Sequence, residues 1–66
     1  MSIEKIIEYV EDRVKEIEYE QGELNDLLRN NVDLDVNEEK WMRYQDEKED
    51  LQEMLKLAKF FVMNGM

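Results

Sequence analysis

The side chains of this sequence that could do chemistry are almost all carboxylates. The 66 residues include 18 Asp and Glu against 9 Lys and Arg, a formal charge of −9, with no His and no Cys. Histidine is the commonest metal ligand and the usual general base, and cysteine supplies thiolate ligands and disulfides. We therefore expect no catalysis, no metal and no cofactor, and expect binding through charge.

Many of the acids recur at helical spacing. In the first half they fall at every seventh residue, with others on adjoining rows, and in the second half they fall at steps of three and four. Such spacings place side chains on one face of a helix, where like charges destabilise it by about 0.2–0.5 kcal/mol per pair. The candidate partner contacts are Glu4, Glu8, Glu11, Asp12, Glu18, Asp46, Glu49, Asp50 and Glu53.

Two interpretations fit these rows. Carboxylates four residues apart rise about 6 Å along a helix, a distance of the same order as the separation of successive phosphates on a DNA strand. The rows could therefore occupy a basic groove built for DNA. Alternatively, they form a solvated face that only keeps a small protein soluble. Either way, such a surface repels nucleic acid and anionic lipid and attracts basic proteins.

Other chemical motifs are incomplete. Residues 33–37 match the opening of a calcium-binding loop, but Glu38 replaces its glycine and Tyr44 replaces its bidentate glutamate. Helix capping explains Asp35 and Asn37 without a metal. Trp41 and Tyr44 fit a core, with Met42 at its rim, or a partner-binding patch near the loop.

The elements that position these side chains are two helices. Apolar residues alternate at steps of four and three, and proline is absent, a rhythm typical of helices that face other helices. The first helix is expected over about 3–30, capped by Ser2 and left through Asn30 and Asn31. The second is expected over about 38–63, followed by Gly65 as its terminating residue. Its N-cap is either Asn37, because Val36 and Trp41 then match a hydrophobic staple, or Asp35, which makes a capping box with Glu38.

A loop over about 31–36 makes this an all-α antiparallel hairpin, one domain over 1–66. Folding there places Leu24 level with Tyr44, Val10 level with Ala58, and Gln21 level with Lys48. The Gln21 and Lys48 layer either fixes register or is a polar edge. A single hairpin cannot cover all of its open end, so we expect a homodimer, a four-helix bundle. The expected dimerisation residues are Ile3, Ile6, Met54, Leu57, Phe60 and Phe61.

Residues 1–5 do not contain a basic stretch followed by an apolar run, so we expect no secretory signal, and the apolar run at 60–63 is too short to span a bilayer. We expect a cytoplasmic protein with no membrane partner.

In size, charge and expected fold, the chain resembles the small acidic phage-encoded DNA-mimic proteins, such as the phage inhibitors of the bacterial nucleoid protein HU. The resemblance covers the whole chain and rests on no motif. It implies a host-takeover inhibitor acting in the bacterial cytoplasm, with the acidic rows on the DNA-binding surface of an HU-like protein. The alternative is a structural or assembly protein that acts through its apolar face.

Two other families share the hairpin. The loop at 34–38 is similar to the bend of the RNA-binding Rop regulators, but the basic residues that RNA requires are scattered here among twice as many acids. The short acidic sporulation phosphatases carry a Ser-Gln-Glu-Leu-Asp motif that this sequence lacks.

Overall fold

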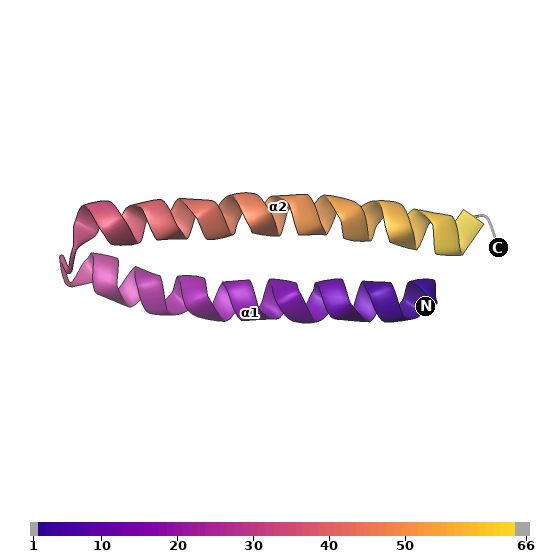
Figure 1. The fold of residues 1–66 in the computed structure, drawn as a ribbon, viewed down its shortest axis with the longest axis horizontal. Helices are drawn as coiled ribbons and strands as arrows, with labels where there is room; N and C mark the ends of the chain where they lie inside the picture. The colour runs from indigo at the N-terminus through magenta and orange to yellow at the C-terminus, as the bar shows by residue number, and fades with distance from the viewer. Residues whose placement is uncertain (1, 65–66) are drawn as a thin grey trace.

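A computed structural model describes residues 2–64, which form two α-helices joined by a short loop. Helix α1 spans Ile3–Arg29 and helix α2 spans Leu34–Asn64. The helices lie antiparallel in a rod 50 Å long and 16 by 14 Å across, with the loop at one end (Figure 1). The start of α1 and the end of α2 meet at the other, open end. The all-α hairpin predicted from the sequence is therefore confirmed.

The ends of α1 follow the capping chemistry expected of its sequence. The Ser2 hydroxyl oxygen accepts a hydrogen bond from the Lys5 backbone N–H at 3.3 Å. At the other end, the backbone N–H of Asn30 donates to the Asp26 carbonyl at 3.1 Å. Asn31 then turns the chain with a φ of 59°, a left-handed conformation that asparagine tolerates better than most residues. Both predicted ends of this helix are confirmed.

The predicted start of α2 is wrong by about one turn. The helix begins at Leu34, so Asn37 and both members of the alternative capping box lie inside it. The Asn37 backbone N–H donates to the Asp33 carbonyl at 2.9 Å, and its side-chain amide donates to the Val32 carbonyl at 2.7 Å. Val36 is 55% exposed, so the hydrophobic staple that indicated the later start does not form. The buried Asn37 side chain therefore links the loop to α2 by a hydrogen bond and does not cap the helix.

The far end of α2 agrees with the sequence. The helix ends at Asn64, one residue beyond the predicted end. Gly65, expected to follow as the terminating residue, lies outside the described residues. Neither helix, over residues 2–64, contains an apolar stretch long enough to cross a membrane.

The core is a single seam between the helices. The buried apolar side chains come from α1: Val10, Val14, Ile17 and Leu24. Their counterparts on α2 are half-buried: Trp41, Tyr44, Leu51, Leu55 and Ala58. The predicted stripes are therefore confirmed from Val10 to Leu24 and from Trp41 to Ala58, with Trp41 and Tyr44 in the seam and Met42 exposed at its rim, whereas Ile3 and Val62 at the open end are exposed. Because only one side of each helix is covered, the hairpin leaves much of its apolar surface in water.

The register agrees with the prediction near the two ends and differs at the polar layer. Leu24 with Tyr44, and Val10 with Ala58, line common hollows as expected. Gln21, however, does not pair with Lys48. Its side-chain amide donates to the Gln45 side chain at 3.0 Å and to the Trp41 carbonyl at 3.4 Å. Both of these partners lie nearer the loop than Lys48 does.

Candidate protein-binding surface

Two ion pairs between the helices identify the two broad faces of the hairpin. Glu11 of α1 meets Lys59 of α2 at 3.3 Å, and Arg13 of α1 meets Glu47 of α2 at 2.8 Å. Successive helix residues are about 100° apart, so Glu11 and Arg13 project on opposite sides of the core seam. We call these surfaces the Lys59 face and the Arg13 face. Residues seven positions from a member of either pair lie on the same face.

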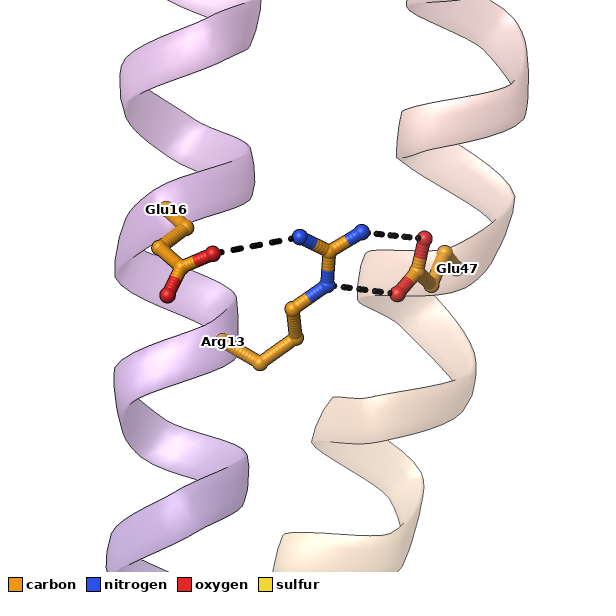
Figure 2. Close-up of polar contacts among 3 residues, drawn as sticks. All are labelled: Arg13, Glu16 and Glu47. Atoms are coloured by element: carbon orange, nitrogen blue, oxygen red, sulfur yellow. Dashed lines mark hydrogen bonds and ion pairs between the residues drawn. The ribbon is translucent and has the colours of Figure 1, made fainter.

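On the Arg13 face, the guanidinium of Arg13 bridges the helices (Figure 2). Its Nε and Nη2 donate to both carboxylate oxygens of Glu47 at 2.8 and 3.1 Å, and its Nη1 donates to Glu16 at 3.2 Å. Bidentate pairing of this kind adds geometric specificity to charge attraction. The hydrogen bonds from Arg13 lower the pKa of the Glu47 carboxyl, and those to Glu47 raise the pKa of Arg13.

The predicted α1 contacts lie mainly on the Lys59 face. Glu4 and Glu18 are seven residues from Glu11 on either side, so these three form one row, with Glu8 adjoining it. Asp12 is the exception. It lines a shallow hollow with Arg13 and Glu16, toward the other face.

The predicted α2 contacts lie along the outer side of that helix. Glu49 and Glu53 share a shallow hollow with Lys56, while Asp46 shares another with residues nearer the loop. Asp50 is seven residues from Arg43 and so turns toward the Arg13 face. The structure therefore arranges the nine acids as two stripes, one on each helix, rather than as one continuous patch.

Most of these nine carboxylates are unpaired. The ion pairs among the described residues use Glu16, Glu47, Asp26, Glu39 and Glu11. Of these, only Glu11 belongs to the predicted contacts. Glu49 accepts a 3.4 Å hydrogen bond from Gln45, and the other seven make no ion pair or side-chain hydrogen bond within residues 2–64. All but Glu11 are exposed, so their charge is available to a partner.

The open end of the Arg13 face is an apolar hollow of about 320 Å³. Five of the six predicted dimerisation residues line it: Ile3, Ile6, Met54, Leu57 and Phe61. Phe60 does not. Its ring packs edge-on against Phe61 with centroids 6.3 Å apart, and both rings are about 60% exposed. The hollow places an unpartnered apolar surface on the face opposite the α1 acid row.

Nearer the loop, the Arg13 face carries a second hollow, of about 450 Å³, that is lined by charges of both signs. Glu20 and Glu23 stand on its α1 side, and Lys40 and Arg43 stand on its α2 side. Neither this hollow nor the Arg13 bridge was predicted from the sequence. The available signal was opposite charge beside the two apolar stripes, since Arg13 directly precedes Val14 and Glu47 lies three residues after Tyr44.

Within residues 2–64, no three acidic side chains converge closely enough to hold a metal ion. Comparison of the chain with protein families, curated proteins and solved structures gives no match. Interpretation of the surface therefore rests on its own geometry and charge.

Proposed function

We propose that this chain is a non-enzymatic inhibitor that binds a basic DNA-binding protein, of the HU-like nucleoid class, and blocks its DNA-binding surface by DNA mimicry. The observation that carries the proposal is the set of seven exposed, unpaired carboxylates in two stripes. Within residues 2–64, four of the nine cations form ion pairs, and Glu11 is the only predicted contact among the acids that they meet, so the other carboxylates keep their charge. A basic groove would compensate that charge as it compensates phosphates.

The spacing of the α1 row supports the same partner. Glu4 and Glu8 are separated by about 6 Å of helix rise, which is comparable to the separation of phosphates along one strand. Because the row lies on a single helix, its carboxylates repeat at a regular spacing. Exposed charge pairs are screened beyond about 8–10 Å at ordinary ionic strength, so the complex should weaken steeply as salt is raised.

The test is competition between this protein and a labelled DNA duplex for purified HU-like protein. The informative variant neutralises three unpaired acids in and beside the α1 row: Glu4→Gln, Glu8→Gln and Glu18→Gln. Its matched control neutralises three exposed acids near the loop with the same change in net charge: Asp33→Asn, Asp35→Asn and Glu38→Gln. At roughly 0.5 kcal/mol for each exposed pair, the first variant should bind about tenfold more weakly, and the control should stay close to the parent.

Equal weakening of both variants would mean that net charge alone matters, and absence of DNA displacement by the parent protein would overturn the proposal. A second variant, Glu49→Lys with Glu53→Lys, tests the α2 stripe on the outer side of that helix. Unchanged affinity there would remove α2 from the contact surface.

We also propose that the chain is a homodimer, with the apolar hollow of one copy covered by the other in a four-helix bundle. The support is the exposure of Phe61 and Leu57 at 60% and 57%, which is unusual for large apolar side chains grouped in one hollow. Phe61→Asp should therefore halve the mass measured by light scattering.

The second candidate function is a structural or assembly protein, favoured by the same hollow. In that case Phe61→Asp abolishes partner binding directly, and neutralising the α1 acid row has no effect. Under DNA mimicry, the α1 variant weakens binding while the dimer persists.

A further inference from the structure

The Arg13 face is not uniform along its length, and this asymmetry bears on how a second copy can cover it. The apolar hollow occupies the open end, the Arg13 bridge occupies the middle, and the charged hollow lies toward the loop. Within the charged hollow, α1 contributes acids and α2 contributes the two cations Lys40 and Arg43. A second copy that covers this face must pack against the apolar hollow at one end and the charged hollow at the other.

We infer that the occupant of this face is a second copy of the chain lying parallel to the first, with both loops at the same end. The inference rests on the homodimer proposed above and specifies its arrangement. A two-fold axis along the rod places α1 of one copy over α2 of the other at the same level. Apolar hollow then meets apolar hollow, and Glu20 and Glu23 of each copy face Lys40 and Arg43 of the other.

The antiparallel alternative mismatches both ends. A two-fold axis across the rod reverses one copy, so that the apolar hollow of each covers the charged hollow of the other. Met54 and Leu57 would then cover the charges of Glu20, Glu23, Lys40 and Arg43 without offering them an opposite charge, and desolvating charges without new partners is unfavourable. In both arrangements the middle of the Arg13 face of one copy packs against the middle of the same face of the other copy. This part of the face therefore does not distinguish the two arrangements.

The size of the face argues against a third arrangement, in which only the open ends overlap. The face is 50 Å by 16 Å, a projected area close to the roughly 800 Å² that each partner of a stable complex covers. Overlap limited to the apolar hollow would use only part of this length. Full-length parallel packing uses all of it.

Covering the Arg13 bridge is compatible with this packing. Its guanidinium already donates to both oxygens of Glu47 and to Glu16. A cation whose hydrogen bonds are already made loses less on desolvation than an unpaired one. The α1 acid row lies on the opposite face of each copy and stays exposed.

Distance measurement between identical labels tests the arrangement. The chain has no cysteine, so Asn30→Cys at the loop and Lys5→Cys at the open end each give one nitroxide per copy. Packed helices lie about 10 Å apart, so the parallel dimer predicts label separations within roughly 30 Å for both variants. Antiparallel packing predicts about the 50 Å rod length at both sites, and overlap of the open ends alone gives a short distance only at Lys5.

A charge variant tests the proposed cross-pairs separately. Lys40→Glu with Arg43→Glu should raise the dimer dissociation constant at least tenfold. Its matched control, Lys15→Glu with Lys56→Glu, makes the same change in net charge away from the hollow and should leave it within threefold. Light scattering on the parent protein tests dimer formation separately from the parallel arrangement. A monomer at micromolar concentration overturns the dimer itself, whereas a dimer with long distances at Asn30 overturns only the parallel arrangement.

Discussion

Replacing Gln21 by leucine should stabilise the hairpin by about 1 kcal/mol. Gln21 is 5% exposed in the seam and donates to Gln45 at 3.0 Å and to the Trp41 carbonyl at 3.4 Å. A neutral hydrogen bond contributes roughly 0.5–1.5 kcal/mol, and the longer one belongs at the low end, so the loss is about 1–2 kcal/mol. Burying a leucine side chain contributes roughly 1.5–3 kcal/mol.

The two groups that accept hydrogen bonds from Gln21 keep other partners in Gln21→Leu. Gln45 is only half-buried, so its side-chain amide can turn to water. The Trp41 carbonyl lies inside α2, where the helix ladder supplies a backbone donor. Glutamine and leucine have similar helix propensities, so the backbone contributes little to the difference. The apolar gain should therefore exceed the lost hydrogen bonds.

The assay is urea unfolding followed by circular dichroism, with parent and variant at equal protein concentration because a dimer makes apparent stability depend on concentration. Gln52→Leu is the control. It lies seven residues beyond Gln45 but is exposed, so its effect should stay within about 0.5 kcal/mol. If Gln21→Leu lowers the free energy of unfolding by more than about 1 kcal/mol, the hydrogen-bonded layer stabilises the seam more than an apolar side chain could, and the reasoning is refuted.

Three further outcomes follow from particular residues. Gly22→Ala should raise the free energy of unfolding by about 1 kcal/mol in urea titration, since an added Cβ meets no atom within 4 Å; a loss would contradict this. Asn37→Ala should lower it by about 1 kcal/mol by removing the 2.7 Å bond to the Val32 carbonyl, and an unchanged midpoint would show that this bond is dispensable. Arg13 holds the pKa of Glu47 below its ordinary 4.5, so the stability from this pair is complete above pH 4.5 and is lost as pH falls further. Unfolding titrations at pH 6 and pH 3 should show a smaller acid loss in Glu47→Gln than in the parent, and equal losses would exclude the pair as a cause.

The spacing of the apolar residues was sufficient to predict most of the fold. The stripe from Val10 to Leu24 identified the seam because steps of three and four keep side chains on one side of a helix. The start of α2 was missed for a local reason. Asn37 has a strong preference for N-caps, and Val36 with Trp41 matched a staple, so local pattern favoured a later start. The competing interaction, a hydrogen bond from Asn37 to Val32, depends on how the loop closes and has no signature in spacing.

The candidate surface was predictable in part. The stripes of acids follow from helical spacing alone, and so does the apolar open end. Whether a carboxylate is already paired depends on the relative placement of two helices, as Glu11 with Lys59 shows. The charged hollow was missed because Lys40 and Arg43 become neighbours of Glu20 and Glu23 only once the hairpin closes.

The position of the loop relative to the buried residues has a consequence for hydrogen exchange. The buried side chains run from Val10 to Asn37, so none lies on the last turns of α2, and both helices are free to fray at the open end. In an isolated hairpin, amide protection should therefore be greatest around Ile17 and Gln21 and decline toward Phe61, because opening free energy follows local burial. The gradient of amide protection can therefore show which surface is covered. A second copy covering the apolar hollow would slow exchange at the end of α2, whereas a partner bound along the α1 acid row would leave it fast.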